Sequence, residues 1–324
     1  MKEVSKMIVT RILVLLGFAI TFLVSAACSE QVGTPIYFQS DRDGQSEIYS
    51  IWDDGTNLQR LTTDPAEDTI PSLSLDGAKL AWIKSGNNGT DIYTMNPDGT
   101  GAQNLTNGTI PGVIDYVTWS FKGDKLVLSV SDPQVADGNY QIYSINSSDG
   151  SGYTRLSQDD TISHYHPRTN MQGVGYIVSV GDLTKNSLDL LLLNLEGKAM
   201  GKVPNETFRT SNDFQASGIS EDFATYQSNG RLIMFSTNAS GVFEIYRVEA
   251  DGRRPANVTM QSDSNQTQPD WGGALDGNTF AYVSDQDGNP EIYIQSSDTR
   301  VPTRLTVNDA NDTNPTWIKV VSSE

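Results

Sequence analysis

One short sequence motif occurs near both ends of the chain and restricts its possible folds more than any other feature. Segment 36–62 contains Ser-Asp-Arg-Asp-Gly, then Glu-Ile-Tyr, Asp-Gly and Arg-Leu-Thr. Segment 280–306 contains Ser-Asp-Gln-Asp-Gly, Glu-Ile-Tyr and Arg-Leu-Thr in the same order. Short β-branched and aromatic runs separated by Asp-Gly turns predict antiparallel strands joined by tight hairpins. A unit that is present at both ends indicates an array of repeats.

Six copies of this unit align on its central apolar pair. The pair recurs every ~45 to 55 residues, which is the length of a four-stranded propeller blade. The pairs are Ile48-Tyr49, Ile92-Tyr93, Ile142-Tyr143, Leu190-Leu191, Ile245-Tyr246 and Ile292-Tyr293. An Arg-Leu-Thr-like strand follows each pair, and a Pro-x-Trp-like strand precedes the next copy. The sequence therefore predicts an all-β protein, a six-bladed β-propeller of four-stranded antiparallel blades.

The two ends of the array complement each other. Segment 36–62 supplies three strands and has no Pro-x-Trp strand before it, whereas segment 314–318 supplies that strand with no blade after it. A circular array must close, because open edge strands promote aggregation. We therefore expect the C-terminal strand to complete the first blade as its innermost strand.

These sequence motifs resemble the propeller repeat of the TolB family, the periplasmic proteins of the Tol-Pal system. The resemblance rests on Ser-Asp-Arg-Asp-Gly-x-x-Glu-Ile-Tyr, Arg-Leu-Thr and Pro-x-Trp, and it extends over residues 36–317. It implies a single TolB-like propeller domain over residues 36–324. TolB itself carries an additional α/β domain before its propeller, whereas only the short polar segment 29–35 stands there in this chain.

The first 28 residues have the layout of an export signal. Lys2, Lys6 and Arg11 precede the apolar run 12–24, and three small residues follow before Cys28. The run is shorter than the ~20 residues that a membrane span needs. Small residues before a cysteine resemble the lipobox of bacterial lipoproteins, which implies lipidation of Cys28 and anchoring to a membrane. The alternatives are cleavage by an ordinary signal peptidase and an uncleaved anchor.

Charge and cysteine content narrow the classes of partner. The chain has 22 Lys and Arg against 40 Asp and Glu, a net charge of -18. Such a surface repels phosphate backbones, so we expect no nucleic-acid partner. Its single cysteine excludes an intramolecular disulfide, so stability must come from packing. We expect a monomer in the cell envelope that faces the periplasm or the cell exterior.

His164 and His166 are the candidate metal ligands. They stand two residues apart on a predicted strand, where both imidazoles would point to the same side. Oligogalacturonate lyases, a related propeller family, place metal-binding histidines in the channel. This likeness implies a divalent cation as one alternative, and a structural or surface role is the other. The Asp-x-Asp-Gly turns allow a calcium site but are also ordinary hairpin chemistry. We expect no other cofactor.

Catalytic patterns are not found in the sequence. It contains no Gly-x-Ser-x-Gly elbow, and its only cysteine belongs to the export segment. We therefore expect a binding protein and not an enzyme. The alternative is a metal-dependent enzyme that acts on polysaccharide and resembles oligogalacturonate lyase, with His164 and His166 near its centre.

The predicted binding face is the side of the propeller that carries the irregular loops. Loops between the second and third strands of a blade and the crossings between blades emerge there, and function tends to lie on variable loops. We expect this face to bind a protein or an envelope polymer. In the alternative, its aromatic and polar residues only cover the blade edges. The candidates are Tyr116, Tyr165, Phe208, Arg209 and Phe214.

Overall fold

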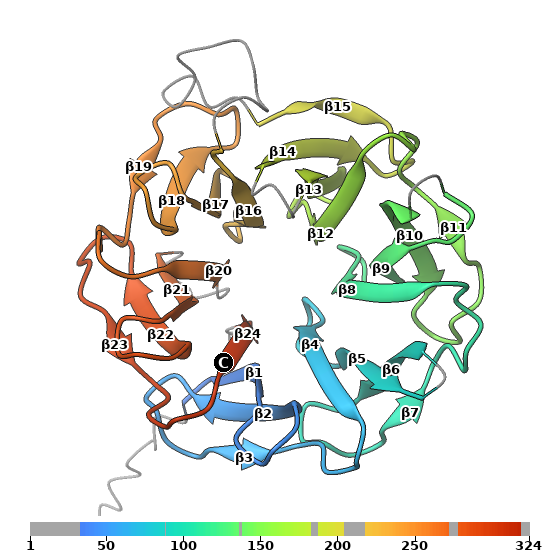
Figure 1. Ribbon diagram of the computed structural model, residues 1–324, viewed down its shortest axis with the longest axis horizontal. Helices are drawn as coiled ribbons and strands as arrows, with labels where there is room; N and C mark the ends of the chain where they lie inside the picture. The colour runs from blue at the N-terminus through green and yellow to red at the C-terminus, as the bar shows by residue number, and fades with distance from the viewer. Residues whose placement is uncertain are drawn as a thin grey trace, which may run out of the picture. The chain divides into compact units, whose positions relative to one another are not determined.

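Each repeat folds into one antiparallel sheet, and Figure 1 shows the sheets placed around a central axis. The computed structural model describes residues 33–87, 89–135, 138–182, 187–203, 218–271 and 278–318, which belong to the unit Gly33–Glu324. These residues form six four-stranded sheets, as predicted. The predicted export segment with Cys28 lies outside the described residues.

The strands of each blade follow one another outward from the axis (Figure 1). Blade 1 consists of β24 (Asp312–Trp317), β1 (Pro35–Ser40), β2 (Glu47–Trp52) and β3 (Gln59–Arg60). Blade 2 consists of β4 (Glu67–Leu73), β5 (Leu80–Gly86), β6 (Gly89–Met95) and β7 (Gln103–Asn104). Blade 3 consists of β8 (Val113–Trp119), β9 (Lys125–Ser131), β10 (Tyr140–Asn146) and β11 (Thr154–Arg155).

The other half of the ring follows the same order. Blade 4 consists of β12 (Ser163–Thr169), β13 (Gly175–Asp182), β14 (Ser187–Asn194) and β15 (Ala199–Lys202). Blade 5 consists of β16 (Glu221–Tyr226), β17 (Leu232–Thr237), β18 (Glu244–Glu249) and β19 (Ala256–Asn257). Blade 6 consists of β20 (Gln266–Asp270), β21 (Thr279–Ser284), β22 (Glu291–Ser296) and β23 (Thr303–Arg304).

The apolar pairs that define the repeat lie in the core. Ile48 and Tyr49 on β2 are 0% and 3% exposed, because neighbouring blades cover both faces of the sheet. One apolar cluster joins Ile36 and Phe38 of blade 1 to Ala281 of blade 6. Burial of such side chains contributes about 1.5–3 kcal/mol each. The core therefore lies between blades, and each blade depends on its neighbours.

The acidic turns of the repeat are held by residues of the same blade. Asp43 accepts hydrogen bonds from the Tyr49 hydroxyl and, at 2.8 Å, from Arg60. Arg60 also donates to Glu47 at 2.6 Å, the acid that precedes the apolar pair. Gly44 has φ +96°, a conformation that favours glycine. The first Asp-x-Asp-Gly turn thus has a structural role.

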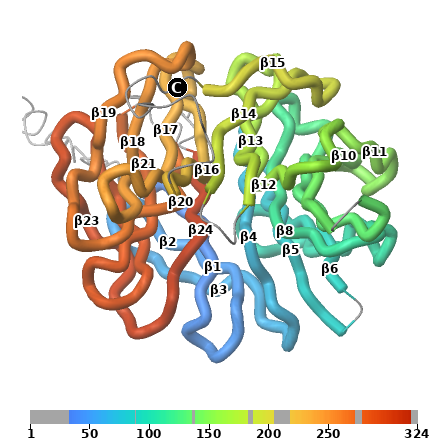
Figure 2. Tube along the Cα trace, turned by 45° about the horizontal axis from the view of Figure 1, so that its top comes forward, coloured from blue at the N-terminus to red at the C-terminus, as the bar shows by residue number. Residues whose placement is uncertain are grey.

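The ring closes as the sequence predicts. Strand β24 pairs with β1 in antiparallel register, with Trp317 opposite Ile36 and Asp312 opposite Ser40. In Figure 2, β1 in blue and β24 in red lie side by side in the same blade. Because β24 covers the inner edge of β1, the first blade has four strands like the other five.

Candidate functional site

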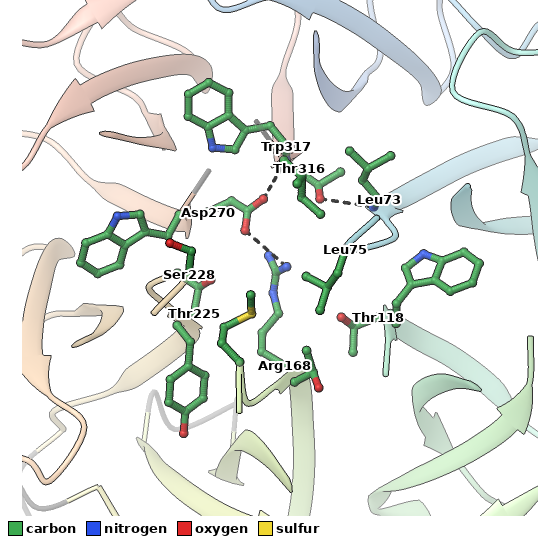
Figure 3. Close-up of a pocket in the computed structure, with 15 residues that line it drawn as sticks. Leu73, Leu75, Thr118, Arg168, Thr225, Ser228, Asp270, Thr316 and Trp317 are labelled. Carbon is green, nitrogen blue, oxygen red and sulfur yellow. Dashed lines mark hydrogen bonds and ion pairs between the residues drawn. The ribbon is translucent and has the colours of Figure 1, made fainter. Parts of the chain in front are cut away.

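The inner strands of all six blades line the central channel, and a cavity lies where these strands end. Its volume is about 230 Å³, and every blade contributes to its wall. Figure 3 shows side chains from the inner strands converging around the Arg168 side chain. The blade crossings lie at the opposite ends of these strands. The cavity is therefore at the channel end away from the loop-rich face, and the binding role of that face stays a prediction.

One position of the repeat forms a ring near the axis. It is the residue between the Pro and the Trp of the Pro-x-Trp-like segment, and in five of the six blades it lines the cavity. The ring residues are Ser72, Thr118, Arg168, Thr225, Asp270 and Thr316. Four of these side chains carry a hydroxyl group, whereas Arg168 and Asp270 carry opposite charges. The departure from the repeat is therefore an ion pair placed inside a ring of hydroxyl groups.

Arg168 and Asp270 reach each other from blades 4 and 6. The Nη1 atom of Arg168 lies 3.4 Å from Oδ1 of Asp270, with side chains 19% and 8% exposed. Burial raises the pKa of Asp270, although the Arg168 charge opposes this shift. Burial also disfavours the Arg168 cation, but the neighbouring Tyr116 and Asp270 outweigh it and raise its pKa. The guanidinium therefore stays charged inside the channel.

A bulge in each inner strand turns side chains into the channel. The register between the first and second strands shifts at this point in every blade. In five blades the bulge contains a non-glycine residue with positive φ, a conformation that costs about 1–2 kcal/mol. These residues are Ile70 (51°), His166 (45°), Phe223 (52°), Gln268 (53°) and Asn314 (54°). A bulge re-aims side chains, so the channel lining does not follow simple strand alternation.

These bulge residues nearly fill the channel one layer deeper. A second cavity of only about 10 Å³ lies there, lined by Ile70, Gln268 and Asn314 among others. The His166 ring stacks on Phe223 with centroids 4.1 Å apart and meets Tyr116 edge-on at 5.1 Å. The larger cavity therefore has a nearly closed floor.

His166 belongs to an acidic cluster in this floor. Its Nδ1 lies 2.7 Å from Oδ1 of Asp222, and its Nε2 lies 3.9 Å from Oδ2 of Asp115. Burial disfavours the imidazolium, but the Asp222 charge and hydrogen bond outweigh it and raise the pKa of His166. Burial raises the pKa of the Asp115 carboxyl. The cluster can hold a proton between one imidazole and two carboxylates.

The two histidines have different surroundings. His164 is 2% exposed, and burial lowers its pKa to about 4, although Asp159 opposes the shift. His166 instead stands beside Asp222 and Phe223. Across the described ranges, no three His, Cys, Asp or Glu side chains form a group that could hold a metal ion. The metal site at His164 and His166 stays a prediction with no third ligand.

Two of the five predicted binding residues lie in the part of the chain that the structure describes. Tyr116 and Tyr165 are each 7% exposed and lie in the channel wall, where the Tyr165 ring is 5.1 Å from that of Tyr140. Phe208, Arg209 and Phe214 lie outside the described residues. Within the part of the chain that the structure describes, no helix is long and apolar enough to cross a bilayer.

Sequence reasoning missed the ion pair in the cavity. Arg168 and Asp270 both occupy the variable middle position of the Pro-x-Trp-like segment, which is Ser or Thr in the other four blades. Comparing that position across the repeats shows one base and one acid among hydroxyl residues. This comparison is the signal that could have found them.

Known proteins match this chain in sequence over part of its length and in fold over most of it. No protein-family model matches. A TolB homolog of Chlorobaculum tepidum is 31% identical over 126 residues, which is 39% of this chain and 27% of that protein. The chain thus matches about a quarter of that relative's length.

Solved structures share the fold at low sequence identity. TolB from Acinetobacter baumannii has a TM-score of 0.65 and 15% identity, over 88% of this chain and 67% of its own. An oligogalacturonate lyase in complex with manganese has a TM-score of 0.56 and 16% identity, over 86% and 75% of the two chains. Such identities establish the fold alone, whereas the sequence match relates the repeats to TolB homologs. This chain is a TolB-like six-bladed β-propeller repeat protein.

Proposed function

We propose that this protein is an exported binding module of the cell envelope and holds a protein partner at an end of its channel. The observation that carries the proposal is the cavity of about 230 Å³ on the axis of a closed ring. Concave sites with apolar walls and a few converging polar groups are typical of binding pockets. Here Leu73 and Trp271 supply apolar walls, and Arg168 and Asp270 supply the polar pair.

Two further features support an envelope role. The resemblance to the TolB family implies a periplasmic protein that works through interactions, and the basic, apolar and small-residue order of segment 1–28 is that of an export signal. Lipidation of Cys28 would anchor the propeller to a membrane surface. The loop-rich face then provides a second surface for a protein or an envelope polymer.

Photo-crosslinking in the host tests the binding function. The full chain is expressed with a photoreactive amino acid in place of Met171 at the cavity rim, or of Asp160 in a blade crossing. Asp251, half exposed in an outer turn of blade 5, is the control position. We expect one discrete crosslinked partner from Met171 or Asp160 and none from Asp251. Absence of a crosslink at both test positions would overturn the proposal.

Cell fractionation tests the anchor. We expect the wild-type chain in the membrane fraction with a metabolically incorporated fatty acid, and Cys28→Ala in the soluble envelope fraction without it. Retention of the wild-type chain in the cytoplasm would contradict export. A soluble, unlabelled wild-type chain outside the cytoplasm would contradict lipidation and leave the binding module standing.

A further inference from the structure

Arg168 has hydrogen-bonding capacity that the protein itself does not use. A guanidinium carries five N–H donors in a planar fork. Within the described ranges, its one ion-pair partner is Asp270, with 3.4 Å between Nη1 and Oδ1. This exceeds the ~2.7–2.9 Å of a good charge-assisted hydrogen bond. The guanidinium also bonds to the Tyr116 hydroxyl, which uses one further donor. Because the side chain lines the cavity and is 19% exposed, its remaining donors are open to a bound molecule.

Asp270 is engaged on both carboxylate oxygens. Its Oδ2 accepts the backbone N–H of Trp317 at 2.9 Å, and the Thr316 hydroxyl also bonds to the carboxylate. Its Oδ1 faces Arg168. Figure 3 shows the acid held at the wall by these neighbours while the Arg168 side chain extends toward the middle. The unused polar capacity of the cavity is therefore for an anionic acceptor and not for a cation.

The remaining walls fit a carboxylate that is attached to an apolar group. Thr118 and Thr225 occupy ring positions equivalent to Arg168 and bring hydroxyl donors to the cavity. Leu75, Met171 and Ile318 follow the inner strands and form a partly exposed apolar rim. A ligand that enters from this side meets apolar side chains first and the guanidinium at depth. That order matches a chain end with an apolar last side chain and a terminal carboxylate.

The size of the cavity also favours the end of a chain. Its volume of about 230 Å³ lies below the ~300–1,000 Å³ of pockets that enclose a drug-sized ligand. The bulge layer, to which Phe223 and Gln268 belong, encloses a cavity of only about 10 Å³. A cavity of this size does not accommodate a polypeptide, whereas the last residue of a chain can enter the larger cavity from its open side.

We propose that Arg168 receives the C-terminal carboxylate of a peptide whose last side chain is apolar. The inference rests on the proposed binding function and names the part of the partner that the cavity recognises. Arginine suits this role because its fork pairs with both oxygens of a carboxylate. Thr118 and Thr225 add hydroxyl donors, and Leu75 and Met171 cover the apolar side chain.

Paired peptides test the proposal on the full chain. The probes are N-acetylated peptides of three alanines followed by Leu, Met, Phe or Val, each as the free acid and as the C-terminal amide. Affinity is measured by calorimetry and by ligand-detected NMR. We expect at least one free acid to bind about tenfold or more tightly than its amide, because the amide loses a charge-assisted pair. Hexanoate, tested in parallel, separates a peptide end from a small organic acid.

Matched variants assign the preference to the cavity. We expect Arg168→Met to reduce the ratio of acid to amide affinity to about one, and Arg168→Lys to retain only part of it. The double variant Arg168→Met/Asp270→Asn also removes the acid that loses its partner in the single variant, and it should show the same loss with a wild-type melting temperature. Arg253→Met, which removes an exposed arginine (74%) from an outer turn, should retain the full preference.

Any one of four results would overturn the inference. The first is equal binding of acids and amides. The second is no binding of any acid at about 5 mM, a concentration that corresponds to weak affinity. The third is a preference for the acid that survives Arg168→Met. Hexanoate binding as tight as that of the peptides would overturn a peptide partner. A partner crosslinked in the host without any acid preference would leave the proposed function standing. Acid preference without any crosslinked partner would instead remove the proposed envelope function and leave only the carboxylate recognition by Arg168 standing.

Discussion

Arg42 and Asp312 form an ion pair across the closure of the ring, with 2.8 Å between Nη2 and Oδ2 although 270 residues separate them in sequence. Asp312 is fully buried and starts β24, whereas Arg42 follows β1 and lies over the Phe38 and Tyr49 rings. This pair joins β1 and β24, the first and last strands of the described chain, which are neighbours in blade 1.

Removal of the buried partner should weaken this closure. We expect Asp312→Ala to lower the free energy of unfolding by about 3–5 kcal/mol, because it leaves Arg42 without its carboxylate in a partly buried site. Urea unfolding measures the change. Asp309→Ala, in the exposed turn just before β24, is the control and should stay within about 0.5 kcal/mol of wild type. Equal effects of the two substitutions would contradict a closing role for this pair.

Tyr49 tests the interpretation of the apolar pair as a core element. It is 3% exposed, and its hydroxyl bonds to Asp43. We expect Tyr49→Ala to cost about 3–5 kcal/mol through the loss of a large buried ring. Tyr49→Phe keeps the ring and loses one hydrogen bond, so its cost should be about 1 kcal/mol. Thermal and urea unfolding compare both with Leu58→Ala, an exposed position (48%) where little change is expected.

His164 should make stability depend on pH in the acidic range. Its pKa falls from 6.5 to about 4 on burial, so the unfolded chain binds the proton more readily than the native one. The free energy of unfolding is therefore highest above the unfolded pKa, where His164 is neutral in both states, and it declines as pH falls toward the folded pKa. Between about pH 7 and about pH 5 we expect a loss of about 2 kcal/mol that His164→Asn does not show. An equal change in the free energy of urea unfolding between the two pH values for wild type and His164→Asn would contradict this.

His166 should titrate in the opposite direction. Burial disfavours its cation, but Asp222 more than compensates and its pKa is raised, so its stabilising contribution is complete below the unfolded pKa. That contribution is lost as pH rises through the folded pKa. With only two histidines in the chain, NMR should show one imidazole titrating near pH 4 and one above the usual range. Asp222→Asn should lower only the second value, and a shift of both signals would speak against the separate surroundings of the two rings.

The repeats carry enough information to predict the blades and their closure, because each blade has the same strand order and the same turn chemistry. Ile48 and Ile292, for example, are both fully buried at equivalent positions. The channel is harder to predict, since each inner strand contains a bulge. A regular strand would point His164 and His166 to the same side, but the register shifts just after Tyr165 and His166 has φ +45°. Local alternation therefore fails where the strand faces the axis.

The charged pair in the cavity is harder to predict for a different reason. The Arg168–Asp270 pair joins blades 4 and 6 across the channel, and no feature of either local sequence specifies the other partner. The repeat pattern predicts the features that all copies share. Arg168 and Asp270 instead differ from the residues at the same position in the other four copies. The binding loops, by contrast, are predicted from their irregularity, and three of the five candidate residues lie outside the described ranges.

The position of β24 also has a consequence for the rate at which this fold forms. Blades 2 to 6 are each built from consecutive strands, but blade 1 must bring together segments 270 residues apart. The entropic cost of such a contact grows with the logarithm of the intervening length, and folding slows as contacts become less local. Closure should therefore be a late kinetic step. Until it occurs, the exposed edge of β1 is the site where an incomplete ring can associate with another chain.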